Sequence, residues 1–156
     1  MVKAINIRAE QAPNSLDLAS SYHSIGNAYN GLNDHKQAIN YFEKARKIRA
    51  EKAPNSLDLA SSYHNIGYAY NNLGAHNEPI NYYQKAIKIY EDKAPNSLDL
   101  ANAYSNIGIV YENKGDKESA KTFYAKSDSI KASLEKAQNN IKPNDYKQLK
   151  DNQNQH

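Results

Sequence analysis

The eight-residue stretch Ala-Pro-Asn-Ser-Leu-Asp-Leu-Ala at residues 12–19 decides the fold, because it returns unchanged at residues 53–60 and 94–101. The interval is 41 residues both times, and 27 of the 41 positions are identical between the first unit and the second. A fixed period of this length is typical of proteins built from stacked structural repeats. The predicted repeats are residues 12–52, 53–93 and 94–134.

Each repeat is predicted to form two helices joined by a short turn. Pro13, Asn14 and Ser15 are typical of a helix start, and a negative charge at Asp17 interacts favourably with the helix dipole. Apolar and small residues then recur every three or four positions, before and after a turn at residues 30–34. No segment shows the alternation of a strand, so the predicted fold is an all-α solenoid of antiparallel helix pairs.

The segments that flank the repeats are predicted to be partial units. Residues 3–10 align with residues 44–51, so residues 1–11 are interpreted as a half-repeat, the second helix of a preceding unit. Beyond the third repeat the period is lost. We predict a C-terminal helical cap at residues 135–150 and a disordered tail at residues 151–156.

Pro79 stands where the first repeat has Ala38. A proline inside a helix costs about 3 kcal/mol, because it lacks a donor and clashes with the preceding turn, but the first turn tolerates it. We therefore expect the second helix of this repeat to begin late, with Asn77 or His76 as its N-cap residue.

The composition argues against several kinds of protein. The 156 residues contain no cysteine, which excludes disulfides, thiolate zinc sites and a cysteine nucleophile. No apolar run is long enough to span a membrane, no signal-peptide pattern opens the chain, and the net charge of +3 is too small to indicate nucleic acid. We expect a cytoplasmic protein without a cofactor. We also expect no metal, because His23 and His64 lie one repeat apart, too far to share an ion.

No catalytic arrangement can be recognised in the chain. Ser20, Ser24, His23 and Asp17 are neighbours on one predicted helix, but no strained turn, oxyanion donor or orienting third group accompanies them. The six glycines recur at helix-packing and turn positions and form no phosphate-binding loop. We therefore expect that the protein is not an enzyme.

The repeat unit resembles the tetratricopeptide repeat. That family places a large aromatic residue, Leu-Gly and Tyr on the first helix, and Ala, an aromatic residue and Ala on the second. The matching residues are Tyr22, Ile25, Gly26, Tyr29, Ala38, Phe42 and Ala45, then Tyr63, Ile66, Gly67, Tyr70, Pro79, Tyr83 and Ala86, then Tyr104, Ile107, Gly108, Tyr111, Ala120, Tyr124 and Ser127. The period of 41 instead of 34 is similar to that of the kinesin-light-chain type. Pro79 and Ser127 depart from the pattern.

The resemblance implies a right-handed superhelix in which the first helices line a concave groove. In that family the groove holds an extended peptide or a partner helix. The resemblance therefore implies a protein–protein interaction scaffold rather than a catalyst.

The groove is predicted to be lined by polar residues that lie away from the apolar stripe of each first helix. Lys and Glu usually fill a solvated helix face, whereas Asn, Ser and His recur here, and Asn can both donate to and accept from a peptide backbone. Tyrosine supplies contact area at low entropic cost. The predicted partner-binding residues are His23, Asn27, His64, Asn65, Tyr68, Asn102 and Asn106.

Some partners can be weighed from the sequence. Tetratricopeptide domains that hold the acidic C-terminus of a chaperone need three basic residues, and those places hold His23, Asn102 and Asn106, so we expect no such binding. The basic residues between Lys44 and Lys52 are interleaved with glutamates, so they are interpreted as a solvated outer face, and no nucleic acid is expected. A second interpretation stays open, in which the incomplete N-terminal repeat mediates self-association by end-to-end stacking or swapping.

Overall fold

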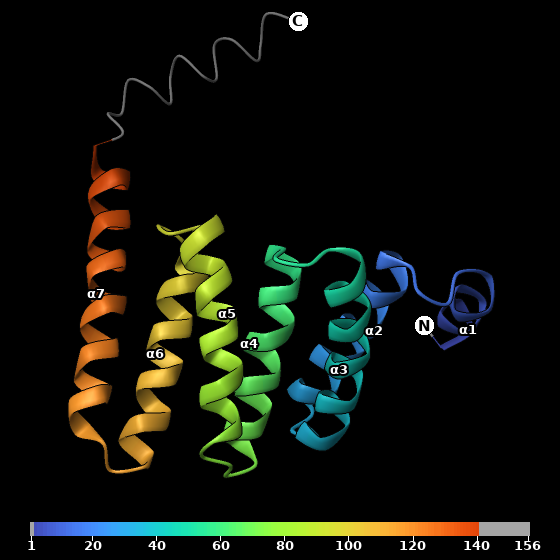
Figure 1. Cartoon of the computed structure of the whole chain (residues 1–156), viewed down its shortest axis with the longest axis horizontal. Coiled ribbons are helices and arrows are strands. Elements are labelled where there is room, and N and C mark those ends of the chain that lie inside the picture. The colour runs from blue at the N-terminus through green and yellow to red at the C-terminus, as the bar shows by residue number, and fades with distance from the viewer. Residues whose placement is uncertain (1, 141–156) are drawn as a thin grey trace, which may run out of the picture.

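The computed structural model describes residues 2–140, which form seven helices and no strand (Figure 1). Residues 141–150 of the predicted cap and the predicted tail at residues 151–156 lie outside the described residues. The helices are α1 (Val2–Gln11), α2 (Leu16–Gly31), α3 (His35–Lys52), α4 (Leu57–Asn72), α5 (Glu78–Lys93), α6 (Leu98–Asn113) and α7 (Lys117–Asn139). The predicted all-α solenoid is confirmed, with α2, α4 and α6 as first helices and α3, α5 and α7 as second helices.

The first helices begin directly after the repeated Pro-Asn-Ser stretch that the sequence predicts as a helix start, and serine is the N-cap residue each time. Ser15, Ser56 and Ser97 each adopt an extended backbone, and each side chain accepts a hydrogen bond from the backbone N–H three residues later, at 3.1–3.2 Å. This side-chain oxygen satisfies one of the backbone donors that every helix start leaves free. One local signal therefore sets the same start in all three repeats.

The two helices of a repeat approach closely because a glycine faces an aromatic ring. A Cβ atom on Gly26 would lie 2.6 Å from the Phe42 ring, and one on Gly108 would lie 2.7 Å from the Tyr124 ring. At Gly67 the corresponding distance to Tyr83 is 3.2 Å. The Ile-Gly step of the first helix is therefore a packing requirement of the helix pair.

The core runs from one repeat into the next. The largest buried cluster joins Leu59 of α4, Ile87 and Tyr90 of α5 and Ile107 of α6. A second cluster joins Phe42 of α3 to Ile66 of α4, so the first and second repeats share a core as well. Neighbouring repeats therefore stabilise one another, as in other solenoids.

Pro79 is accommodated at the start of its helix. The second helix α5 begins at Glu78, two positions later in its repeat than α3, and Asn77 occupies the N-cap position, as predicted. The Asn77 side chain makes no cap hydrogen bond, because its Oδ1 accepts one from Lys114 Nζ at 2.9 Å. The proline lacks an N–H that would have had no partner in this turn.

The departure from the repeat pattern at Ser127 is explained by the polar groups that contact its side chain. It stands where the other repeats have alanine, is fully buried, and bonds to the Ala101 carbonyl oxygen at 2.8 Å and to Ser105 Oγ at 2.7 Å. Ser105 in turn stands where the other repeats have His23 and His64. The third repeat has therefore changed both members of a contacting pair, and the buried hydroxyl is satisfied.

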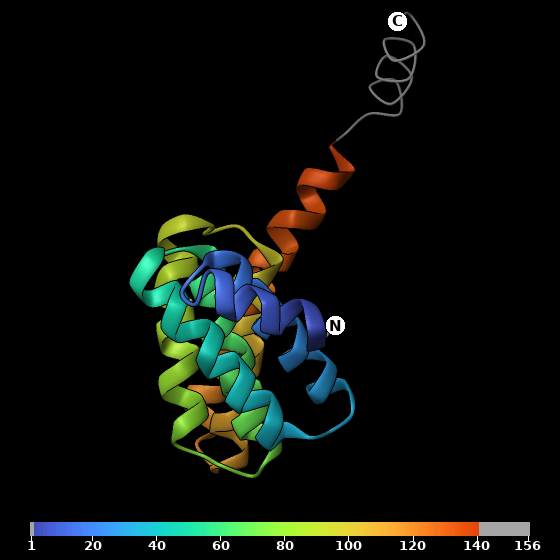
Figure 2. The same cartoon turned by 90° about the vertical axis from the view of Figure 1, so that its right-hand side faces the viewer.

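The helix α1 does not lie parallel to the second helices. In Figure 1 the helix α1 is seen nearly end-on, whereas α3, α5 and α7 run roughly vertically. Figure 2 shows α1 crossing beside α2. Ala9 packs against the cluster of Leu18, Ala19, Ala45 and Ile48. The α2 surface beyond α1 stays partly uncovered, since Ile25 is half-buried whereas its counterparts Ile66 and Ile107 are fully buried.

Candidate partner-binding site

Each first helix keeps one stripe of residues that packing leaves uncovered. The stripe starts at the aspartate of the first turn and continues 3, 7, 10 and 14 positions later, which is the spacing of one helix face. None of these residues is buried. We call this surface the first-helix face; its residues are Asp17, Ser20, Ser24, Asn27 and Gly31 on α2, Asp58, Ser61, Asn65, Tyr68 and Asn72 on α4, and Asp99, Asn102, Asn106, Ile109 and Asn113 on α6.

Equivalent positions of the first-helix face form rows that cross the three repeats. One row is Ser24, Asn65 and Asn106, and the adjacent row is Asn27 followed by Tyr68 and Ile109. Tyr68 is 42% exposed and Ile109 is 40% exposed, which is high for such large apolar side chains. The middle of the face is therefore uncharged, and it becomes apolar toward the third repeat.

His23, which was predicted to contact a partner, takes part in packing. Its ring lies 5.2 Å from the Phe42 ring, between centroids, and its Nδ1 lies 3.1 Å from Arg49 Nη1. Burial, and then the positive charge of Arg49, lower the pKa of His23 to about 4, while Asp58 opposes the shift. The imidazole is therefore neutral at pH 7.

His23 lies between side chains of two other helices. A guanidinium can only donate, so Nδ1 accepts from Arg49. On the other side of the ring, Asn65 Nδ2 lies 3.2 Å from Nε2 and donates to Asn27 Oδ1 at 3.2 Å. These three predicted residues form a link between the first and second repeats.

His64 makes the corresponding link between the second and third repeats. Its Nε2 lies 3.2 Å from the Asn106 carboxamide, and its ring lies 5.4 Å from the Tyr83 ring, edge to face. The Nδ1 atom is buried without a hydrogen-bond partner among the described residues. The cause is Tyr90, which occupies the place that Arg49 holds in the first repeat. Burial lowers the pKa of His64, against the charge of Asp99.

The structure therefore divides the seven predicted residues into three groups. His23, Asn27 and Asn65 are joined to one another, and His64 is joined to Asn106. The exposed Tyr68 and Asn102 make no side-chain hydrogen bond within the described residues. Asn65 and Asn106 thus rest against half-buried histidines.

Arg49 was assigned to a solvated outer face, and this assignment is wrong. Arg49 is 5% exposed, and its Nη1 donates to the Asp58 carbonyl oxygen at 3.0 Å and to Ser62 Oγ at 2.9 Å. The equivalent residue Tyr90 is aromatic and buried, which is the signal in the sequence that this position faces the core. Ile109, which is not among the seven predicted contact residues, is exposed at the same repeat position as Asn27 and Tyr68.

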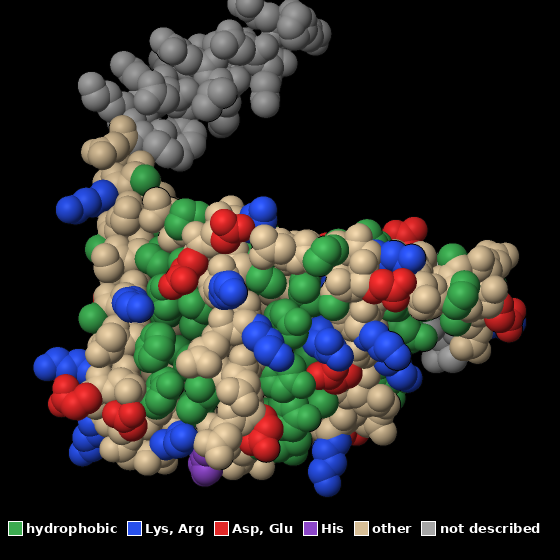
Figure 3. All heavy atoms as spheres, viewed as in Figure 1, with side chains coloured by type: hydrophobic (Ala, Val, Ile, Leu, Met, Phe, Trp, Pro, Cys, Tyr) green, Lys and Arg blue, Asp and Glu red, His purple; other side chains and the backbone are tan. Residues whose placement is uncertain are grey.

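The other basic residues of that run keep to the surface. Lys44 lies over the Tyr22 and Tyr41 rings, at 5.5 and 4.8 Å from their centroids, and Arg46 pairs with Glu43 at 2.6 Å. Lys85 and Lys126 repeat the contact over the aromatic pairs of their own repeats. Figure 3 shows Lys and Arg side chains beside hydrophobic surface across the middle of the molecule.

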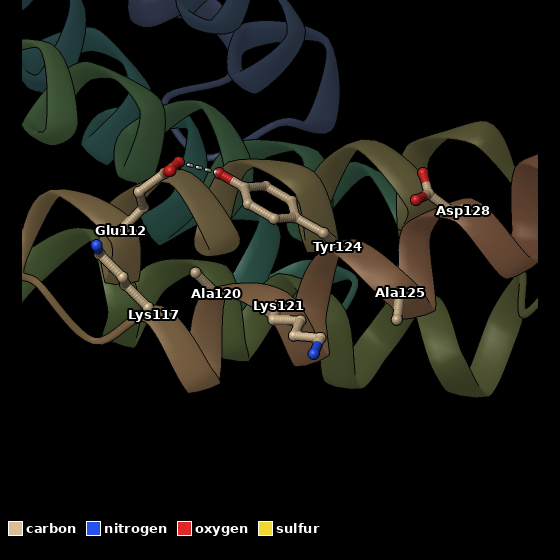
Figure 4. A pocket seen from close by; sticks show the side chains of 7 residues that line it. All are labelled: Glu112, Lys117, Ala120, Lys121, Tyr124, Ala125 and Asp128. Carbon is tan, nitrogen blue, oxygen red and sulfur yellow. Dashed lines mark hydrogen bonds between the residues drawn. The ribbon is translucent and has the colours of Figure 1, made fainter.

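A charged hollow of about 380 Å³ lies on the outer face of α7 (Figure 4). Tyr124 lines the hollow and donates a hydrogen bond to Glu112 at 2.8 Å, and Lys121 and Asp128 line it as well. In the second repeat the positions of Lys121 and Asp128 are the buried Ile80 and Ile87. The surface that joins one repeat to the next is therefore polar on α7.

Residues 2–140 contain neither a membrane-spanning helix nor a metal-binding cluster. No described helix combines the length and the apolar character that crossing a membrane requires. No group of three or more His, Cys, Asp or Glu side chains among these residues could hold a metal ion.

Solved structures with the same architecture give the fold a wider context. The chain is similar to BtubC (BKLC) from P. vanneervenii, with a TM-score of 0.78 and 22% identity over 90% of this chain and 56% of that one. It is similar to the TPR domain of Arabidopsis FLU, with a TM-score of 0.66 and 22% identity over 76% of this chain and 95% of that one. A putative kinesin light chain from Podosopora anserina with nearly identical TPR-like repeats matches with a TM-score of 0.70 and 16% identity, over 85% and 64%.

The chain spans just over half of the BtubC chain, and at these identities the likeness concerns the fold. No curated protein matches it in sequence. The tetratricopeptide repeat profile matches residues 2–51 and 52–130, which together make up most of the chain. This protein therefore belongs to the tetratricopeptide repeat family, and its structural neighbours include repeats of the kinesin-light-chain type.

Proposed function

We propose that this protein is a scaffold that binds an extended peptide or a partner protein on the first-helix face. The observation that carries the proposal is the first-helix face, whose residues are exposed or half-buried and which combines asparagine carboxamides with the exposed Tyr68 and Ile109. Tetratricopeptide proteins are generally interaction scaffolds without catalytic activity, which supports the proposal. Asn27, Asn65, Asn102 and Asn106 would pair with the backbone of the bound segment.

The two histidines have a supporting role in this proposal. His23 orients the Asn65 carboxamide, and His64 contacts the Asn106 carboxamide from the neighbouring helix. Groups that are fixed before binding lose less conformational entropy when a partner arrives. His23 and His64 therefore act as positioning residues, and Asn65 and Asn106 as contact residues.

The experiment is a selection from a phage library of random peptides against the full chain. A double variant, Asn102→Ala with Asn106→Ala, removes two contact groups from the first-helix face. The matched control is Asn40→Ala with Asn81→Ala, since both residues are exposed on second helices. We expect enriched peptides that bind the control and bind the first double variant at least about tenfold more weakly. Equal binding to both variants would place the binding surface elsewhere.

Self-association is the second candidate function, and the partly uncovered aromatic surface of α2 and α3 favours it. Tyr22, Ile25 and Tyr41 are all half-buried there. End-to-end stacking also needs a complementary surface on α7, and that surface carries Lys121 and Asp128. Self-association would then join two copies of the chain through the α2–α3 surface alone.

A further inference from the structure

We infer that the first-helix face selects a segment without acidic residues, which docks a bulky apolar side chain on Tyr68 and Ile109. The inference rests on the proposed function and adds the chemistry of the partner. It is carried by two observations, the charge of the three first helices and the place where this surface becomes apolar.

The first helices carry no positive charge. Helices α2, α4 and α6 contain no Lys or Arg, and their charged residues are Asp17, Asp58, Asp99 and Glu112, all of them exposed. The second helices α3, α5 and α7 contain fourteen Lys and Arg against eight Asp and Glu. Among helices α2 to α7, the Lys and Arg residues therefore all lie on the second helices, and Figure 3 shows some of these side chains.

This division of charge decides which segments the first-helix face accepts. A carboxylate brought to the face loses water, and none of the residues of the face is a cation. Two cations of the second helices, Arg49 and Lys131, hydrogen-bond to the first helices, but they already donate to Ser62 and Ser105, so little charge-assisted bonding repays the desolvation. The exposed aspartates repel it as well, within the Debye length of about 8 Å at physiological salt. A neutral segment meets no such cost, and a Lys or Arg side chain meets charges of opposite sign.

The apolar part of the face fixes where the bound segment is anchored. Tyr68 and Ile109 occupy the same position of adjacent repeats and are 42% and 40% exposed. The first repeat has Asn27 at this position, so the apolar surface is confined to the second and third repeats. Large apolar side chains next to fixed amides can bury a partner side chain and leave its backbone hydrogen-bonded.

The same phage library of random peptides tests this inference. We expect enriched peptides to share one bulky apolar position and to contain fewer Asp and Glu residues than the unselected library. An enriched peptide should bind the Tyr68→Asn and Ile109→Asn variants at least about tenfold more weakly than the wild type. Each substitution introduces asparagine, the residue that the first repeat has at this position. The matched control is Leu32→Asn, because Leu32 is 76% exposed and lies outside the face. It should leave the affinity unchanged.

A further variant tests the charge argument on its own. Asn102→Lys places a cation on an exposed position of the face, and selection against it should recover peptides that contain Asp or Glu. If no peptide is enriched against any form of the protein, the proposed function fails. The inference is wrong if the enriched peptides are acidic, share no apolar position, or bind Tyr68→Asn and Ile109→Asn as tightly as the wild type. In that case the proposed function still stands, provided that Asn102→Ala with Asn106→Ala weakens the binding of these peptides.

Discussion

At the scale of single residues, Arg49 ties three helices together. Its Nη1 bonds to the Asp58 carbonyl oxygen and to Ser62 Oγ on α4, and it faces His23 Nδ1 on α2. A buried guanidinium is costly unless its donors are paired, and the three acceptors supply that pairing. Removing the Arg49 side chain leaves these three acceptors without their donor.

Arg49→Ala should lower the free energy of unfolding by about 2–4 kcal/mol, because it removes buried contacts and leaves polar atoms unpaired. Urea denaturation followed by circular dichroism measures the change. Lys47→Ala on the same helix is the control, since Lys47 is exposed, and it should stay within about 0.5 kcal/mol. An equal loss from both variants would contradict the role of Arg49.

The two half-buried histidines, His23 and His64, predict a loss of stability in mild acid. The folded protein holds the pKa of His23 near 4, and burial lowers that of His64, whereas an unfolded histidine titrates near 6.5. The unfolded state therefore binds more protons as the pH falls below 6.5, so stability present at pH 7 is lost toward pH 5. The loss should be on the order of 1–2 kcal/mol for His23, which keeps some solvent contact.

Urea denaturation at pH 7 and at pH 5 tests this expectation. The double variant His23→Gln with His64→Gln should be less stable at pH 7 but lose less between the two pH values. His76→Gln is the control, because His76 is exposed, and it should keep the wild-type pH dependence. The same pH dependence in all three proteins would assign the acid loss to other groups.

At the scale of helices, the pairing within a repeat depends on a glycine against a ring. Gly26→Ala should lower the free energy of unfolding by about 1–3 kcal/mol, because the new Cβ would lie 2.6 Å from Phe42. Gly31→Ala is the matched control at the end of the same helix, where no atom lies within 4 Å of a new Cβ. It should be neutral or stabilise by up to about 1 kcal/mol. Thermal and urea unfolding of both variants would decide, and an equal effect would disprove the close contact.

Helix starts were predictable from the sequence, and the contacts between distant helices were not. Ser15 marks its helix start because capping depends on a few neighbouring residues, and Asn77 marks the start of α5 because Pro79 is tolerated in the first turn. The pairing of His23 with Arg49 joins residues 26 positions apart, and Arg49 lies in a run whose other basic residues stay at the surface. The orientation of α1 also escaped prediction, because its sequence matches α3 while its surroundings differ.

At the scale of the whole molecule, the two outer surfaces of the solenoid differ in character. The α2–α3 surface beside α1 exposes parts of Tyr22, Ile25 and Tyr41. The outer face of α7 carries Lys121 and Asp128 where the second repeat has buried isoleucines. Terminal repeats with a polar outer face prevent a solenoid from adding further units. The polar face of α7 therefore opposes open, head-to-tail assembly.

The mass of the protein in solution tests this argument. The wild-type chain should show a mass that does not rise with concentration in sedimentation or light scattering. Lys121→Ile with Asp128→Ile gives α7 the residues of the second repeat, so it should associate, with a mass that rises with concentration. Asn40→Ile with Asn81→Ile adds the same apolar bulk to exposed positions of other second helices and should keep the wild-type mass. A wild-type mass that rises to that of two copies would favour pairing through the α2–α3 surface. If the α7 double variant and the Asn40→Ile with Asn81→Ile control associate equally, the charges on α7 have no special role.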